Sequence, residues 1–146
     1  MTYLDTSALI KRFVSEKGSR FVQALFTKDP AVATAKIAYA EVFAALSRKL
    51  REGGLSETQY NSTCRQFERD WPSYIRVDLH DQVLVLARDL VRRHPLRGFD
   101  AIHLASALRL KQALGLELAF AAADGRLLAA ARSEHLRVIH AEGASA

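Results

Sequence analysis

Residues 1–13, MTYLDTSALIKRF, decide the fold of this chain. The apolar run "TYL" is typical of a short buried strand, and it leads directly to Asp5. Two hydroxyl residues, Thr6 and Ser7, then open a helix-forming segment. A buried strand that passes at once into a helix is the beginning of a strand–helix–strand unit. The stretch therefore predicts an α/β fold and raises the question of why an aspartate stands where the strand ends.

The rest of the chain repeats this alternation. Further strand-like runs are "AVAT", "YIRVDL", "ELAFAAAD" and "LRVIHA". Helical patterns lie between them, over 19–28, 36–52, from Ser56 towards Trp71, over 81–93, in "DAIHLASALRLKQAL" up to Gly115, and in "GRLLAAARSE". Strands that alternate with helices favour a parallel sheet covered on both faces. We predict a three-layer α/β/α sandwich with a central, mainly parallel sheet of about five strands, formed by one domain over residues 1–146 with a frayed tail at about 141–146.

Composition excludes several classes of protein. The chain has 146 residues, 49% of them hydrophobic and 25% charged, as in soluble globular domains. No apolar run approaches the roughly 18 residues of a membrane span, and a strand that begins at Thr2 leaves no room for a secretory signal. We therefore expect a cytoplasmic protein. The single cysteine, Cys64, excludes an internal disulfide and a cysteine-based zinc site, and we expect it to be buried or half-buried.

Three aspartates follow from the predicted topology as candidate site residues. Asp5 ends the first strand, Asp124 ends the penultimate strand, and Asp100 opens the "DAIHLASAL" helix. The carboxyl ends of parallel strands lie along one edge, where open α/β sheets bind ligands. We therefore expect these side chains to meet there. The alternative is that each one only caps its own helix, because aspartate is a favoured N-cap.

Glu41 favours a shared site over capping. It lies in "KIAYAEVFAALSRKL" on the same helical face as apolar neighbours, and a carboxylate in an apolar stripe needs a partner. The alternative is that it lies at the margin of the stripe and reaches water. Four converging carboxylates would repel one another, and hard oxygen ligands favour Mg²⁺ or Mn²⁺ over zinc. His103, one turn beyond Asp100, is more typical of a packed histidine than of a ligand.

Four motifs, "YLDTSALIKRF", "AEVFAAL", "FDAIHLASAL" and "AAADGRLLAAA", together resemble the PIN-domain ribonucleases, in particular the VapC-type toxins of type II toxin–antitoxin systems. The resemblance covers essentially the whole chain. It implies that Asp5, Glu41, Asp100 and Asp124 are the metal-binding, catalytic acids, supported by the hydroxyls of Thr6 and Ser7. It also implies a PIN-like fold and endonucleolytic cleavage of RNA that leaves a 5′-phosphate and a 3′-hydroxyl, with one or two Mg²⁺ or Mn²⁺ ions.

Net charge is compatible with an RNA substrate. The chain carries 21 basic and 16 acidic residues, and without the four site acids the basic excess is 9. Arg12, Arg97 and Arg126 flank the motifs and are candidate phosphate contacts, although surface solvation alone would also explain them.

The resemblance further implies a homodimer and a small antitoxin partner that binds the helices of residues 36–72. Contacts there would come from Tyr39, Phe43, Leu46 and Leu50, unless these are core residues. Alternatives are a PIN-fold RNA-processing nuclease without an antitoxin and a non-catalytic module that binds RNA or protein. A haloacid-dehalogenase-type phosphatase would need a second aspartate at Ser7, and a phospho-receiver domain would need a lysine after Lys111.

Overall fold

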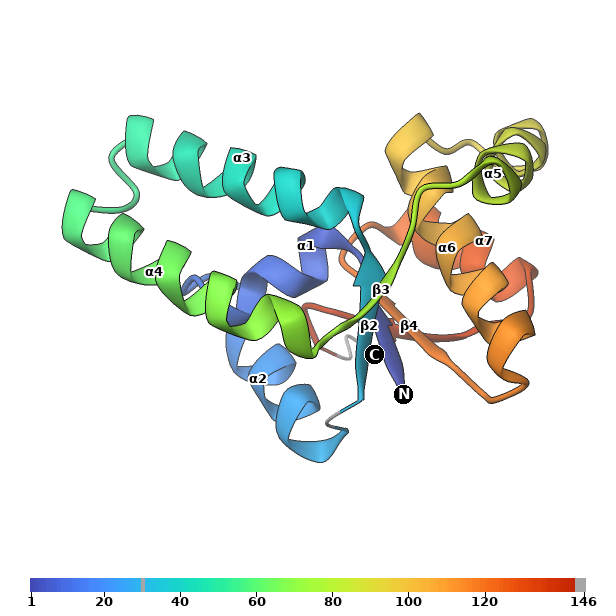
Figure 1. The fold of residues 1–146 in the computed structure, drawn as a ribbon, viewed down its shortest axis with the longest axis horizontal. Helices are drawn as coiled ribbons and strands as arrows, with labels where there is room; N and C mark the ends of the chain where they lie inside the picture. The colour runs from blue at the N-terminus through green and yellow to red at the C-terminus, as the bar shows by residue number, and fades with distance from the viewer. Residues whose placement is uncertain (30, 144–146) are drawn as a thin grey trace.

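The computed structural model describes residues 1–29 and 31–143. Its centre is a five-stranded sheet in the order β3-β2-β1-β4-β5, and every neighbouring pair of strands is parallel (Figure 1). The strands are β1 (Thr2–Leu4), β2 (Val32–Ala35), β3 (Ile75–Val77), β4 (Ala119–Ala122) and β5 (Arg137–His140). The predicted parallel sheet of about five strands is therefore confirmed.

Helices cover both faces of this sheet. Successive side chains of a strand point to opposite sides, and those of β1, β2 and β4 are buried on both. Tyr3 belongs to one hydrophobic core and Leu4 to the other. The core that contains Leu4 lies under α1 (Thr6–Leu9), α2 (Ser19–Lys28), α3 (Ile37–Arg51) and α4 (Glu57–Asp70), with the short 3-10 helices η1 (Ile10–Arg12) and η2 (Trp71–Ser73). The core that contains Tyr3 lies under α5 (Asp81–Arg93), α6 (Gly98–Leu114) and α7 (Gly125–Ser133). The three-layer prediction is confirmed.

The strand order places a topological switch between β1 and β4. From β1 the chain adds β2 and β3 on one side, and it later adds β4 and β5 on the other. Such a switch leaves a crevice at the carboxyl ends of the two central strands. Asp5 follows β1 and Asp124 comes shortly after β4, so the fold brings the ends of these distant segments side by side.

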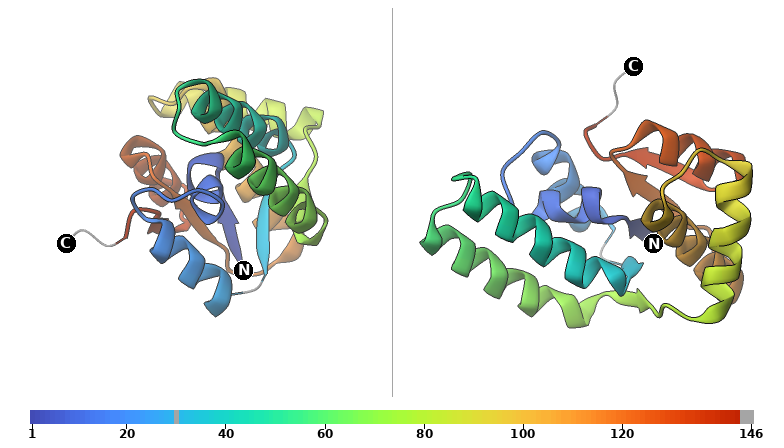
Figure 2. Two further views of the ribbon diagram at one scale, coloured as in Figure 1. Left: turned by 90° about the vertical axis from the view of Figure 1, so that its left-hand side faces the viewer. Right: turned by 90° about the horizontal axis from the view of Figure 1, so that it is seen from above.

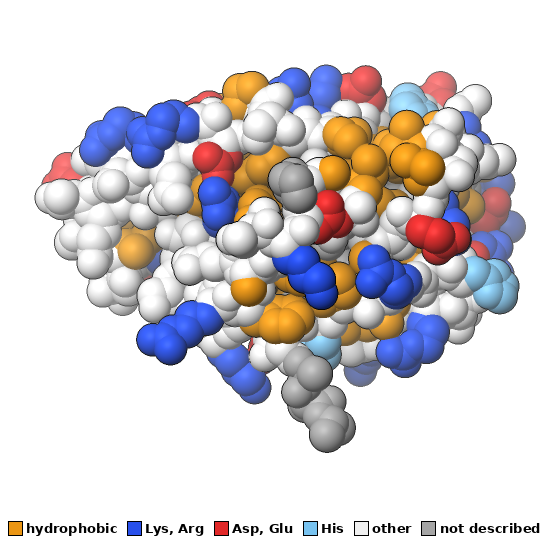
Figure 3. Space-filling model, turned by 90° about the horizontal axis from the view of Figure 1, so that it is seen from below, with side chains coloured by type: hydrophobic (Ala, Val, Ile, Leu, Met, Phe, Trp, Pro, Cys, Tyr) orange, Lys and Arg blue, Asp and Glu red, His pale blue; other side chains and the backbone are white. Residues whose placement is uncertain are grey.

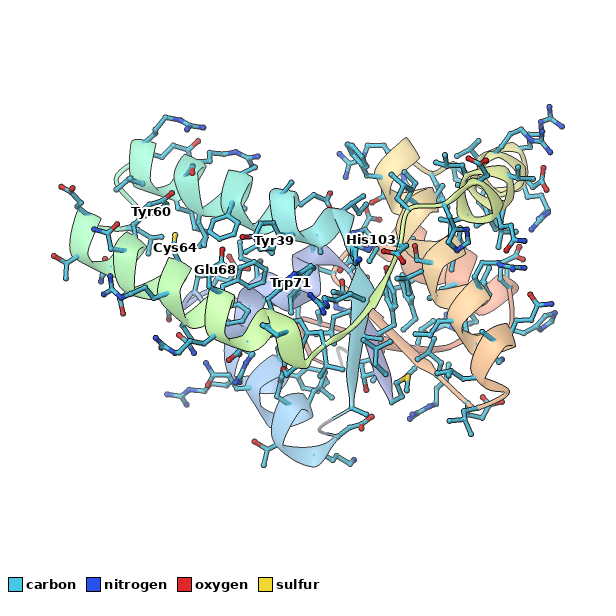
Figure 4. All side chains as sticks on the ribbon, in the orientation of Figure 1. Tyr39, Tyr60, Cys64, Glu68, Trp71 and His103 are labelled. Carbon is cyan, nitrogen blue, oxygen red and sulfur yellow. The ribbon has the colours of Figure 1, made fainter. Side chains whose placement is uncertain are left out.

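Helices α3 and α4 form an antiparallel pair that extends beyond the sheet (Figure 2). Ser56 caps α4, and its side chain and that of Gln59 form a reciprocal capping box. Leu46 is fully buried, so it is a core residue and not a surface contact. Tyr39 is 36% exposed and lies near Glu68 of α4 and Trp71 of η2, while Cys64 is half-buried, as expected (Figure 4).

The end of the chain differs from the sequence prediction. Ala141 is fully buried and its N–H donates to the Ala122 carbonyl, and the Glu142 carboxylate pairs with Lys17. The predicted fraying therefore does not hold for residues 141–143, because they pack against β4 and the start of α2. The rest of that predicted tail, residues 144–146, lies outside the described residues. Among the described residues, no helix has the length and apolar character needed to cross a membrane.

Candidate active site

Asp5 stands at the carboxyl end of β1 and is only 5% exposed. Its Oδ1 accepts hydrogen bonds from Ser7 Oγ at 2.7 Å and from the Ala8 N–H at 2.9 Å, so it caps α1 as well. Burial raises the pKa of Asp5, although His103, Ser7 and Ala8 act in the opposite direction, and the charge of Asp100 raises it further. Burial thus disfavours the charged form of the Asp5 carboxylate, and a nearby positive charge would stabilise that form.

Glu41 has partners that the sequence did not reveal. Thr6 Oγ1 donates to Glu41 Oε1 at 2.5 Å, and His103 Nε2 lies 2.9 Å from the same oxygen. Partial burial alone would raise the pKa of Glu41, but the hydrogen bonds from His103 and Thr6 outweigh it, so the pKa lies below its ordinary value. The carboxylate in the apolar stripe is thus paired within the site and is not satisfied by water alone.

Tyr3 and His103 form the buried base of this network. Tyr3 is fully buried, His103 is 3% exposed, and the Tyr3 hydroxyl lies 2.8 Å from His103 Nδ1. Burial raises the pKa of Tyr3 well above its ordinary value, so the phenol keeps its proton and donates to Nδ1. We therefore assign His103 the tautomer with its proton on Nε2, which donates to Glu41. Figure 4 shows His103 beside the top of the sheet.

Asp100 and Asp124 are the other two predicted acids of the site. The prediction that Asp100 opens its helix is wrong by two residues. Helix α6 begins at Gly98, and Asp100 lies in its first turn. Arg97 Nε approaches Asp100 Oδ2 at 3.4 Å. Asp124 caps α7, and its Oδ1 accepts from the Arg126 and Leu127 N–H groups. The Ala123 N–H donates to Ser7 Oγ, which ties the end of β4 to the hydroxyl that also binds Asp5.

Two hollows connect these acids. One, of about 500 Å³, is lined by Glu41, Arg97, Gly98, Phe99, Asp100 and Ile102. The other, of about 330 Å³, is lined by Pro95, Arg97, Asp100, Asp124 and Arg126. Arg97 and Asp100 line both, so the hollows adjoin and form one groove along the carboxyl edge of the sheet. This groove is lined by Glu41, Asp100 and Asp124, whereas the buried Asp5 lines neither hollow.

The four carboxylates share one arrangement of their oxygens. Each has hydrogen-bond partners on one oxygen, namely Asp5 Oδ1, Glu41 Oε1, Asp100 Oδ2 and Asp124 Oδ1, although the contact of Asp100 Oδ2 with the exposed Arg97 is long, at 3.4 Å. Among the described residues, no group donates a hydrogen bond to the second oxygen of any of them. Within residues 1–29 and 31–143, however, no three His, Cys, Asp or Glu side chains already stand close enough to enclose a metal ion. The donor set suits a hard cation whose remaining ligands are water.

The three predicted arginines have different surroundings. Arg97 and Arg126 line the groove, and the Arg97 side chain is 85% exposed. Arg12 lines neither hollow. Its Nε lies 2.9 Å from Asp70 Oδ2, and its guanidinium lies 4.4 Å from the centre of the Phe26 ring. Lys and Arg side chains are also spread over the opposite end of the molecule, at the amino ends of the strands (Figure 3). Positive charge is therefore not confined to the groove.

Sequence reasoning missed Tyr3 as a member of the site and treated His103 as simple packing. The available signal was the spacing of His103, three residues after Asp100 and so on the same helical face. Nothing in the local sequence indicates that Tyr3 meets a histidine 100 residues away, because that contact depends on the pairing of β1 with β4 and on the packing of α6.

Comparisons with known proteins show the family and the fold of this chain. The PIN domain model matches residues 2–133. Ribonucleases VapC45 and VapC49 of Mycobacterium tuberculosis are each 39% identical over 108 residues, which is 74% of this chain and 75% of theirs. Among solved structures, FitAcB from Neisseria gonorrhoeae has a TM-score of 0.71 at 17% identity, over 97% of this chain and 98% of that one. A toxin–antitoxin complex from Klebsiella pneumoniae has 0.67 at 18% identity, over 99% and 100%. These two structures show the shared fold. The family that the four motifs predict is thus confirmed: this chain belongs to the PIN-domain family.

Proposed function

We propose that this chain is a metal-dependent endoribonuclease and the toxin of a toxin–antitoxin pair. The observation that carries the proposal is the set of four carboxylates at one sheet edge, each of which has a hydrogen-bond partner on one oxygen and, among the described residues, none on the other. Capping alone does not explain the set, since Glu41 lies in the second turn of α3 and Asp100 is not an N-cap. The curated relatives named ribonucleases supply the substrate class.

Asp5, Glu41 and Asp100 are the proposed ligands of Mg²⁺ or Mn²⁺, and Asp124 binds directly or through water. One or two ions would make a water nucleophilic and stabilise the leaving oxygen of a phosphodiester. The chain's own part is to hold the ligands. Ser7 and the Ala8 N–H orient Asp5, while Thr6 and His103 orient Glu41. Cleavage would leave a 5′-phosphate and a 3′-hydroxyl, as the family resemblance implies.

The toxin role is supported by relatives and neighbours whose names include VapC and toxin–antitoxin complexes. We propose a small antitoxin as the partner, bound on the α3/α4 pair, and a homodimer of this chain. Tyr39, which is 36% exposed, and the partly buried Phe43 and Leu50 are the remaining candidate contacts there, since Leu46 is core.

Metal addition tests the site without a known RNA sequence. In chelator, the purified chain should show no cleavage of total RNA, and Mg²⁺ or Mn²⁺ should restore it. Mn²⁺ should also raise the melting temperature, because an ion at about 100 times its Kd stabilises the folded state by about 2.7 kcal/mol. Asp100→Asn should lose both effects.

Asp81→Asn is the matched control, because Asp81 is an exposed acid in the first turn of α5 and lies outside the groove. It should keep both the metal-dependent cleavage and the shift in melting temperature. Cleavage that persists in chelator, or a melting temperature that Mn²⁺ leaves unchanged, would show that the acids serve only as caps and structural partners.

A further inference from the structure

Phe99 is the most exposed large hydrophobic side chain in the part of the chain that the structure describes, at 61%. It is the second residue of α6 and directly precedes Asp100. The first turn of α6 therefore presents an aromatic ring to solvent immediately beside a proposed metal ligand. An exposed aromatic ring gains free energy when a partner covers it, so its surroundings indicate which partner fits.

The surroundings of Phe99 are charged. It lines the hollow of about 500 Å³ together with Glu41, Asp100, Arg97 and the apolar Ile102. The centre of a protein–protein interface is usually depleted of charged residues, which makes this groove a poor seat for an apolar side chain of a partner protein. A nucleotide combines a flat ring with a phosphate, and so matches an aromatic face next to an arginine.

The size of the hollow agrees with such an occupant. A volume of about 500 Å³ lies within the range of small-ligand sites, roughly 300–1,000 Å³. Gly98 leaves the hollow open beside Phe99. Apart from its chain neighbours and the nearby backbone of α6, no atom of the described residues lies within 4 Å of the position that a Cβ would take there. Arg97, whose side chain is 85% exposed, stands between this hollow and the one that contains Asp124.

We propose that Phe99 is a stacking platform for one unpaired RNA base, next to the phosphodiester that the acids act on, with Arg97 as the contact to an adjacent phosphate. The inference rests on the proposed function and adds two substrate-binding residues, of which Phe99 requires a base that is unpaired. Inside a duplex, both faces of a base are covered by its neighbours, so no face is available to Phe99.

Binding to RNA in EDTA tests the inference without cleavage. The probes are fluorescein-labelled 12-nucleotide RNAs of mixed sequence, offered single-stranded, as a duplex, and with abasic riboses in place of the bases. Phe99→Ala should weaken binding of the single strand by about 5- to 150-fold, the effect of losing one base–aromatic stack. Phe99→Trp should retain binding, and Phe99→Leu, which is apolar but has no π face, should lose most of it.

Leu116→Ala is the matched control, because Leu116 is 58% exposed just beyond the other end of α6 and lies outside the groove. It should bind like the wild type. The duplex and abasic probes should bind the wild type and Phe99→Ala equally. In cleavage assays with Mn²⁺, Phe99→Ala should raise KM more than it lowers kcat, since stacking contributes to binding of substrate and transition state alike.

Equal binding of the single strand by wild type and Phe99→Ala would overturn the inference. So would a loss of self-association in Phe99→Ala on size-exclusion chromatography, because Phe99 would then be a protein contact. Failure of the proposed function is distinguishable: the wild type would cleave no RNA with Mn²⁺, whatever Phe99 does to binding.

Discussion

Tyr3→Phe is the sharpest test of the buried network beneath the acids. The substitution removes one oxygen and keeps the ring, which stacks on Phe120 with centroids 5.4 Å apart. The Tyr3 hydroxyl lies 2.8 Å from His103 Nδ1, and both side chains are at most 3% exposed. Without the hydroxyl, Nδ1 of His103 is a buried acceptor that has lost its donor. Water cannot take the place of that donor, because the position is buried.

The magnitude follows from that burial. An unsatisfied buried polar group costs about 1–3 kcal/mol, so the free energy of unfolding should fall by about that amount. For a chain of this length, each kcal/mol lowers the melting temperature by about 2–4 °C. Urea unfolding in EDTA measures the change directly. His103 should also hold Glu41 less firmly, so the Kd for Mn²⁺, measured by calorimetry, should rise.

Tyr60→Phe is the control for loss of a tyrosine hydroxyl. Its hydroxyl lies 3.2 Å from Ser47 Oγ in a half-buried position, where water can take its place, so its cost should stay below about 0.5 kcal/mol. If Tyr3→Phe unfolds at the wild-type urea concentration, the hydroxyl does not hold His103, and the assignment of Nε2 as the donor to Glu41 fails with it.

Three further outcomes are expected. The pKa of Asp5 is raised by burial, so in EDTA the stability that Asp5 contributes should be lost as pH rises from below 3.8 through the raised folded value. Asp5→Asn should escape this loss and be the more stable form at pH 7, and equal urea midpoints at pH 7 would contradict it. The pKa of Glu134 is lowered because hydrogen bonds from His94 and Arg93 outweigh its partial burial. Glu134→Gln should therefore destabilise the protein at pH 7. The difference in urea midpoint between this variant and the wild type should vanish as pH falls below the lowered pKa. Leu46→Ala should cost about 2–5 kcal/mol in urea unfolding, because Leu46 is fully buried; a cost under 1 kcal/mol would place it outside the core.

Local sequence was enough to predict the elements. The apolar runs that end near Asp5 and Asp124 are strands, and the helix expected from Ser56 begins there, with Ser56 as its N-cap. These features depend on neighbours within a few residues, which is why they can be read from the chain. The tail is an exception. Ala141 has no local signal for burial, and only its contacts with β4 keep it in the core.

The sequence by itself determined which carboxylates stand at the strand ends and helix starts, since parallel strands must all end at one edge. Tertiary structure decided how those carboxylates are held. One partner of Glu41 is His103, 62 residues later in the chain, and the partner of His103 is Tyr3, 100 residues before it. It also decided that Arg12 pairs with Asp70 while Arg97 lines the groove. The physical reason is that a hydrogen bond depends on the positions of both of its atoms, and for residues this far apart those positions exist only once the sheet has paired and the helices have packed against it.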